Sequence, residues 1–324
     1  MIPTIIFIFN QLRFTNSLTN NLPFFSRHTL APCTDVRTPL SSFAFSSRSQ
    51  SDFDGWCDYQ KIVRIGVITS TGGVAGRGLF STQEAPLGSV VASIPANCVF
   101  APCPDDDGEW QASLTATTTV LATGDGSDSD QTWIRAWEGG GHPDMKELYR
   151  IVAEDGLDAA IRRTGTLARE LARHIPSLLE SEARSEVETR LKNFGRRLPS
   201  MMEVGRGISS SKDLVKWYCL VLSRAGGLGY DWNDVTGIVP FFDMLNHCHD
   251  KELANVDLMT VGQCVDKMGE GKTQEDLGLE RKDFVLVTTK SVRAGEELLT
   301  QYQTDMENKD CLLKLWLQYG IPPP

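Results

Sequence analysis

The order of patterns along this chain constrains its fold more than any other feature. Short, β-branched segments occupy residues 61–102 and return within residues 211–324, whereas residues 103–210 carry helical patterns separated by acidic and glycine-rich loops. A doubly wound sheet would need a regular alternation of strands and helices, and a helical bundle would have no strand patterns. We therefore predict an α+β fold of short strands and small sheets with a long helical insertion.

Individual elements can be predicted inside these regions. The glycine-rich residues 69–80 are expected to form a loop that opens into a short strand. The helical pattern at 144–193 is broken at Pro176, and a serine stands at the cap position of the pattern at 211–225. Strands are predicted at 61–68, 89–95, 284–292 and 297–302, and a further helix at 311–319.

The first fifty residues differ in composition from the rest of the chain. They contain one acidic residue, Asp35, against four arginines, among many Ser, Thr, Asn and Phe residues. This composition is typical of a transit peptide. We therefore predict a disordered targeting leader at 1–55 and a location in a plastid or mitochondrion, otherwise the cytoplasm. The alternatives are a signal-peptide core, a disordered tail without a targeting role, or a start codon placed too far upstream.

Charge and cysteine content argue against several function classes. The formal net charge is −10, whereas a nucleic-acid surface needs clustered Lys and Arg to displace counterions. We expect no nucleic-acid partner, and a cationic partner is easier to accommodate. No apolar stretch is long enough to span a membrane. Eight scattered cysteines without CxxC pairs indicate a reducing compartment. Separately, we expect the protein to be a monomer.

The glycine-rich loop does not have the features of a phosphate-binding loop. A Walker loop needs Lys followed by Ser or Thr after its last glycine, and a helix that supplies amide groups. Here Gly78 is followed by Leu79 and Phe80, inside a strand pattern. A dinucleotide fingerprint would need a helix at the same place. Glycines that only permit tight turns remain the plainer alternative.

The segment GIVPFFDMLNHCHD, residues 237–250, places two histidines beside a cysteine. Adjacent side chains generally point apart, and no Cys or His pair elsewhere has finger-like spacing, so we expect no metal. A nucleophilic Cys/His pair would also need a third group to orient it. A buried apolar helix that ends in a polar cap is the plain alternative for this segment.

Five segments together resemble, in sequence and in order, the SET-domain protein methyltransferases. The resemblance covers residues 61–324 and is closest to the branch with a helical insertion, which includes the Rubisco large-subunit lysine methyltransferase and the actin-histidine methyltransferase. It implies a SET fold with a pseudoknot-like crossing, over a domain at 56–324, and S-adenosyl-L-methionine as cofactor. The segments are GRGLFSTQEAPLGSVVASIP, SRAGG, DMLNHCHD, FVLVTTKSVRAGEELLTQY and LLKLWLQYGIP.

The resemblance also implies which residues hold the cofactor. The backbone of Asn246 and His247 would pair with the adenine, while the Asn246 side chain would hold the crossing and the methionine moiety. Asp243 would support them, and Arg224 would meet the cofactor carboxylate, unless it is a surface arginine that closes a helix. The loop that approaches the cofactor through its backbone corresponds to Ala75, Gly76 and Arg77. Ala75 stands where the Rubisco enzyme branch has an acidic residue.

Two tyrosines correspond to the catalytic centre of the family. Tyr302 matches the catalytic tyrosine, and Tyr319 matches a second aromatic residue of the lysine channel, although a core tyrosine is an alternative for Tyr319. Ile321 stands where the family often has Phe, which removes an aromatic face beside the adenine.

The expected function is methyl transfer to a lysine, or alternatively a histidine, of a non-histone protein. One alternative is a SET-fold peptide-binding protein that has lost catalysis. The other is a metal-dependent hydrolase that uses His247, Cys248 and His249.

Overall fold

The fold begins earlier than the predicted boundary at residue 56. The structure, a computed structural model, describes residues 47–74, 76–102, 109–123, 133–134, 140–204, 210–268, 279–302 and 307–323. Helix α1, Ser47–Tyr59, lies partly inside the predicted leader, yet Phe53 and Trp56 on it are buried in the core. Phe53 lies inside the predicted leader and Trp56 directly after it, so the predicted boundary is too late by at least part of this helix. The prediction for residues 1–46 and for Ala75 lies outside the described residues.

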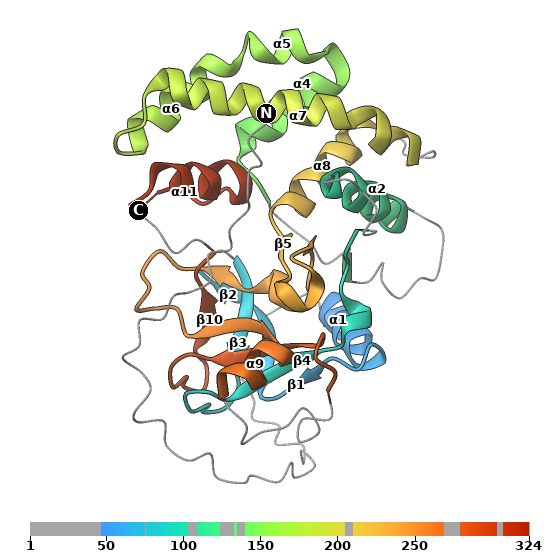
Figure 1. The fold of residues 1–324 in the computed structure, drawn as a ribbon, viewed down its shortest axis with the longest axis vertical. Coiled ribbons are helices and arrows are strands. Elements are labelled where there is room, and N and C mark those ends of the chain that lie inside the picture. The colour runs from blue at the N-terminus through green and yellow to red at the C-terminus, as the bar shows by residue number, and fades with distance from the viewer. Residues whose placement is uncertain are drawn as a thin grey trace. The chain divides into compact units, whose positions relative to one another are not determined.

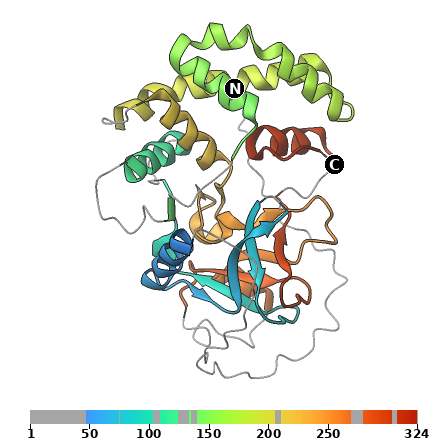
Figure 2. The same ribbon diagram turned by 180° about the vertical axis from the view of Figure 1, so that it is seen from behind.

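Two four-stranded sheets combine strands from both ends of the domain. The first has the order β1-β4-β9-β8 and is antiparallel throughout. Its β-branched, apolar strands β4 and β9 are largely buried, as central strands of a sheet usually are. Figures 1 and 2 show the blue and cyan N-terminal strands beside the orange and red C-terminal strands, and in each sheet two N-terminal strands adjoin two C-terminal strands. The bounds are β1 Val63–Arg64, β4 Val90–Ile94, β8 Val256–Thr260 and β9 Phe284–Thr288.

The second sheet carries four of the residues predicted to form the site, Gly76, Arg77, Asn246 and His247. Its order is β2-β3-β10-β7, and β7 lies parallel to β10. The predicted glycine-rich loop is instead a hairpin, because Thr and Ser residues extend β2 as far as the pair Gly73–Gly76. The bounds are β2 Val67–Gly73, β3 Gly76–Ser81, β7 Asn246–His247 and β10 Glu297–Thr300, and a separate two-stranded sheet pairs β5 Gly226–Gly227 with β6 Thr236–Gly237.

The helical insertion is divided more often than its periodicity predicts. The predicted break at Pro176 is confirmed, since it falls between α6 and α7. A second break occurs at Gly156, whose φ of 90° ends α4 in a conformation that favours glycine. Helix α7 also continues past Asn193, through Pro199. The bounds are α2 Trp110–Thr123, α4 Pro143–Asp155, α5 Leu157–Ile161, α6 Thr164–His174 and α7 Glu180–Val204.

Helix α8, Ser211–Leu222, contributes to two separate hydrophobic cores. Its N-terminus is capped by Ser210, one residue before the predicted serine, which accepts a hydrogen bond from the Asp213 N–H. Trp217, Leu220 and Val221 pack in the core formed around the strands. Another face of the helix packs among the helices α4 to α7. Because α8 ends at Leu222 and Ser223 is its C-cap, Arg224 directly follows the helix.

The remaining helices are short. Helix α11, Lys309–Lys314, continues into a π-helical turn, η4, Leu315–Tyr319, as the pattern at 311–319 predicts. Helix α9 spans Val261–Met268. Within the described part of the chain, no helix is long and apolar enough to cross a bilayer. Three 3₁₀ turns complete the set: η1 Ala96–Cys98, η2 Tyr230–Trp232 and η3 Phe242–Met244.

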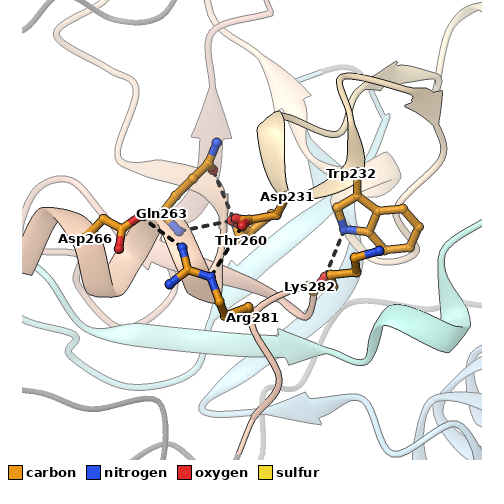
Figure 3. Close-up of polar contacts among 7 residues, drawn as sticks. All are labelled: Asp231, Trp232, Thr260, Gln263, Asp266, Arg281 and Lys282. Carbon is orange, nitrogen blue, oxygen red and sulfur yellow. Dashed lines mark hydrogen bonds and ion pairs between the residues drawn. The ribbon is translucent and has the colours of Figure 1, made fainter.

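A polar network anchors the loop between β5 and β6 to the first sheet. Figure 3 shows the Asp231 carboxylate accepting a hydrogen bond from the Thr260 hydroxyl and pairing with Arg281, whose Nε lies 3.5 Å from Oδ1. A Cβ at position 262 would lie 2.5 Å from Asp231 Oδ2, so a side chain larger than that of Gly262 would displace the Asp231 carboxylate. The contacts of Asp231 with Thr260 and Arg281 therefore restrain the β5–β6 loop, which follows Arg224 in the chain.

Candidate functional site

The parallel pair of β7 and β10 brings together residues that are more than fifty positions apart. Asn246 lies opposite Leu299, and His247 lies opposite Thr300. Tyr302 follows two residues beyond the end of β10. The two motifs, DMLNHCHD and GEELLTQY, are therefore neighbours in the folded chain.

The Asn246 side chain ties β7 to the glycine-rich hairpin. Its Nδ2 donates to the Arg77 carbonyl at 2.9 Å and to Glu297 Oε1 at 2.7 Å. The other oxygen of Glu297 accepts from the Val74 N–H at 2.9 Å. Asn246 and Glu297 thus hold the hairpin at two points. Sequence reasoning missed Glu297, which lies in the GEELLTQY segment but whose role depends on contacts with distant residues.

Gly78 has no side chain and so leaves space for the Asn246 and Glu297 side chains to meet beside the hairpin. A Cβ at position 78 would lie 2.4 Å from Glu297 Oε1 and 2.8 Å from Asn246 Nδ2. Glycine therefore allows the hairpin backbone to approach both polar side chains without displacing them. The close approach gives a physical reason for at least one glycine of this segment.

His247 acts as a neutral hydrogen-bond acceptor. Its Nδ1 accepts from the Tyr302 N–H at 3.0 Å, while its buried Nε2 has no hydrogen-bond partner among the residues that the structure describes. Burial, with a smaller contribution from the charge of His249, lowers the pKa of His247 to about 4. The imidazole is therefore uncharged near neutral pH, with its proton on Nε2. Among the described residues, no group of three or more His, Cys, Asp or Glu could hold a metal ion.

Two tyrosines and His247 form a continuous ring cluster. The rings of Tyr302 and Tyr319 lie 4.9 Å apart, and those of Tyr302 and His247 lie 5.2 Å apart, measured between centroids. The Tyr302 hydroxyl donates to the Leu245 carbonyl. Burial raises the pKa of Tyr302 and raises that of Tyr319 to about 12, so both phenols are neutral.

Arg224 is held in a buried ion pair, unlike a surface arginine that only closes a helix. Its Nε lies 3.8 Å from Asp243 Oδ2, and the Asp243 side chain is fully buried. Nη1 of Arg224 also donates to Ser223 Oγ at 3.0 Å. The charges of Arg224 and Asp243 are both close enough to shift the pKa of Tyr302. This ion pair therefore belongs to the same site as the ring cluster.

Two contributors to the site could not be found from the sequence. Phe241 is buried and has a φ of 71°, a value that is unusual for a residue other than glycine, immediately before the turn that carries Asp243. Trp133, from the helical insertion, donates to Asp243 Oδ2 at 3.1 Å. Neither residue has a local sequence signal, because both positions are set by contacts between distant segments.

Comparisons with known proteins identify the fold. No family model and no curated protein matches the chain. Rubisco LSMT bound to sinefungin and monomethyllysine superposes with a TM-score of 0.53 at 17% identity, over 86% of this chain and 57% of that one. The SET domain of LSMT bound to lysine and AdoHcy superposes with a TM-score of 0.52 at 16% identity, over 85% of this chain and 57% of that one. The same domain bound to methyllysine and AdoHcy superposes with a TM-score of 0.50 at 16% identity, over 87% of this chain and 58% of that one.

This likeness extends over most of the chain but only over part of the matched structures. The chain spans less than two thirds of their length, and the identities are low. The shared arrangement of small sheets and helices agrees with the predicted α+β architecture. The protein therefore has the fold of a SET domain.

Proposed function

We propose that this protein is an S-adenosyl-L-methionine-dependent methyltransferase that modifies a lysine of a non-histone protein. The observation that carries the proposal is the joining of Asn246, His247 and Tyr302 by the β7–β10 pair, with the Arg224–Asp243 ion pair beside them. The similar solved structures contain cofactor analogues or products together with lysine or methyllysine. A histidine acceptor is the alternative within the same chemistry.

The residues present fit this cofactor. Gly76 and Arg77 lie on β3, in the same sheet as Asn246 and His247, so their backbone belongs to the same part of the molecule. The Nε2 of His247, unpartnered among the described residues, is a buried donor in that sheet. Arg224 supplies the cation that a carboxylate needs. We propose that the backbone of Asn246 and His247 pairs with the adenine, and that Arg224 meets the amino-acid end.

The acceptor lysine must lose its proton before it can attack. A free lysine has a pKa of about 10.4, so reaching the neutral amine at pH 7 costs about 4 to 5 kcal/mol in water. The buried rings of Tyr302 and Tyr319 disfavour an ammonium ion and so lower its pKa. When bound, the cofactor supplies an electrophilic methyl group on a sulfonium, whose positive charge acts in the same direction.

Tyr302 is suited to orient the amine without removing its proton. Its hydroxyl hydrogen is directed to the Leu245 carbonyl, so the lone pairs of the phenolic oxygen are available to accept hydrogen bonds. Its raised pKa keeps the phenol neutral, which argues against a phenolate base. Proximity and alignment would then supply much of the rate acceleration.

Labelling tests this function even while the acceptor protein is unidentified. The protein is incubated with methyl-labelled S-adenosylmethionine and matched organellar and cytosolic extracts, and the labelled residue is identified by mass spectrometry. We expect label on a lysine of a non-histone protein. Absence of label from every extract, although the protein binds the cofactor, would favour the peptide-binding alternative, which the replacements at Ala75 and Ile321 also suggest.

A further inference from the structure

Trp133 connects the helical insertion to the buried ion pair of the site. Its indole is 1% exposed, and its Nε1 donates to Asp243 Oδ2 at 3.1 Å. The same oxygen lies 3.8 Å from Arg224 Nε. We propose that Trp133 is a positioning residue which sets the Asp243 carboxylate, and through it the Arg224 guanidinium, for the carboxylate of the cofactor. The inference rests on the proposed function.

The position of Trp133 is fixed on both sides by aromatic contacts. Trp56 of α1 stacks on it with the centroids 5.4 Å apart and the planes 17° apart. Phe100 meets it edge-on at 6.3 Å. Because offset stacks and edge contacts both restrain the orientation of a ring, the indole N–H is held toward Asp243.

The same aromatic group also supports the turn that carries Asp243. Phe53 lies between Trp56, at 5.9 Å, and Phe241, at 6.4 Å. Phe241 has positive φ, a conformation that persists only when its surroundings restrain it. Asp243 is therefore restrained through its backbone by Phe241 and through its side chain by Trp133.

The electrostatic consequence concerns how strongly Asp243 attracts Arg224. A charge-assisted hydrogen bond between a guanidinium and a carboxylate usually measures about 2.7 to 2.9 Å, and the Arg224 Nε to Asp243 Oδ2 distance is longer. The Trp133 N–H donates a hydrogen bond to that oxygen and so weakens the attraction of its negative charge for Arg224. Without this donor, the buried carboxylate would draw Arg224 closer and compete with an incoming ligand carboxylate.

Two ligands that differ at the amino-acid end separate positioning from general support. S-adenosylhomocysteine has the carboxylate, whereas 5′-methylthioadenosine has the same adenosine and no carboxylate. Trp133→Phe keeps an aromatic ring and removes the N–H. We expect the affinity of this variant for S-adenosylhomocysteine to fall about five-fold, because losing the hydrogen bond to the charged Asp243 changes how Arg224 meets the ligand carboxylate. Its affinity for methylthioadenosine should stay within about two-fold. Calorimetry measures both.

A matched control disturbs a buried aromatic residue in the other hydrophobic core. Phe194→Leu, among the helices of the insertion, should lower thermal stability while the ratio of the two affinities stays unchanged. If Trp133→Phe does not fold, benzothienylalanine at position 133 keeps the bicyclic ring and removes only the N–H, with the same expected result. Equal weakening of both ligands by these Trp133 variants, or no weakening, overturns the inference. A wild-type protein that binds neither ligand overturns the proposed function itself, and the inference with it.

Discussion

At the scale of single residues, the site depends on polar groups that satisfy one another across two strands. Asn246 bridges Arg77 and Glu297, and His247 accepts from the backbone of Tyr302. These groups lie on separate segments, so each contact restrains a different part of the chain. Removing one partner takes a hydrogen bond from groups that are at least partly buried, and leaving such a group unsatisfied costs more than the net value of a single bond.

Replacing Asn246 by Ala should lower both stability and cofactor affinity. The change leaves the Arg77 carbonyl and Glu297 Oε1 without their common donor, so we expect the free energy of unfolding to fall by about 2 to 4 kcal/mol. Urea denaturation and calorimetry with S-adenosylmethionine measure the two effects. Ser210→Ala, which removes the α8 cap, should cost about 1 kcal/mol and leave the affinity unchanged. Normal affinity in Asn246→Ala would exclude the assigned role.

Gly78 is a second position where one atom should matter. Gly78→Ala places a Cβ 2.4 Å from Glu297 Oε1, so the hairpin must move away from Asn246. We expect weaker cofactor binding and a clear loss of thermal stability. Gly55→Ala, where the added Cβ meets nothing within 4 Å on helix α1, is the control and should be neutral or slightly stabilising. Equal effects at the two positions would refute the close-approach argument.

His247 predicts a pH dependence of stability with a definite sign. Its pKa is about 4 in the folded protein, below its ordinary value of 6.5. Between these values the unfolded chain binds the proton more readily, so stability decreases as pH falls from about 6.5 toward about 4, by at most about 1.4 kcal/mol per pH unit. Denaturation at pH 7 and pH 5 measures this loss. His247→Asn, which keeps an acceptor, should lose less stability over this range, and an equal loss would contradict the prediction.

At the scale of elements, α1 is part of the domain. Trp56→Ala removes a side chain that stacks on Trp133, and truncation of a buried aromatic residue typically costs about 3 to 5 kcal/mol. Tyr59→Ala on the same helix is the control, since Tyr59 is 73% exposed. Thermal unfolding should show a large shift for Trp56→Ala and little for Tyr59→Ala. Similar melting temperatures for both variants would show that α1 is dispensable.

The sequence predicts element types better than element limits. Alternation and β-branching locate β4, β9 and β10, because these strands have strong local patterns. The hairpin of β2 and β3 has the sequence of a loop, since its glycines give no alternating pattern, and its contacts with Glu297 and Asn246 come from distant segments. Likewise, motif order locates Tyr302 and Asn246. Trp133 and Phe241 give no signal, since their positions result from packing between distant segments.

At the scale of the whole domain, α8 joins the helical insertion to the strands. Residues on different faces of this helix pack in the two hydrophobic cores, and its last residue precedes Ser223 and Arg224. Two helical parts of the chain therefore contribute to the site: the insertion contributes Trp133, which contacts Asp243, and α8, which follows the insertion, positions Arg224. This arrangement explains why a long insertion between two groups of strands can form part of one functional unit.

The most direct measurement is single-turnover methyl transfer by wild-type protein and Tyr302→Phe, with the labelled acceptor protein as substrate. Tyr302→Phe keeps the ring contacts with His247 and Tyr319 but removes the hydroxyl. Cofactor affinity should be unchanged, while the rate should fall at least about ten-fold, because the hydroxyl acts mainly as the amine aligns. Tyr149→Phe in the helical core is the control and should react at the wild-type rate. Transfer by Tyr302→Phe at the wild-type rate would contradict the catalytic centre described above.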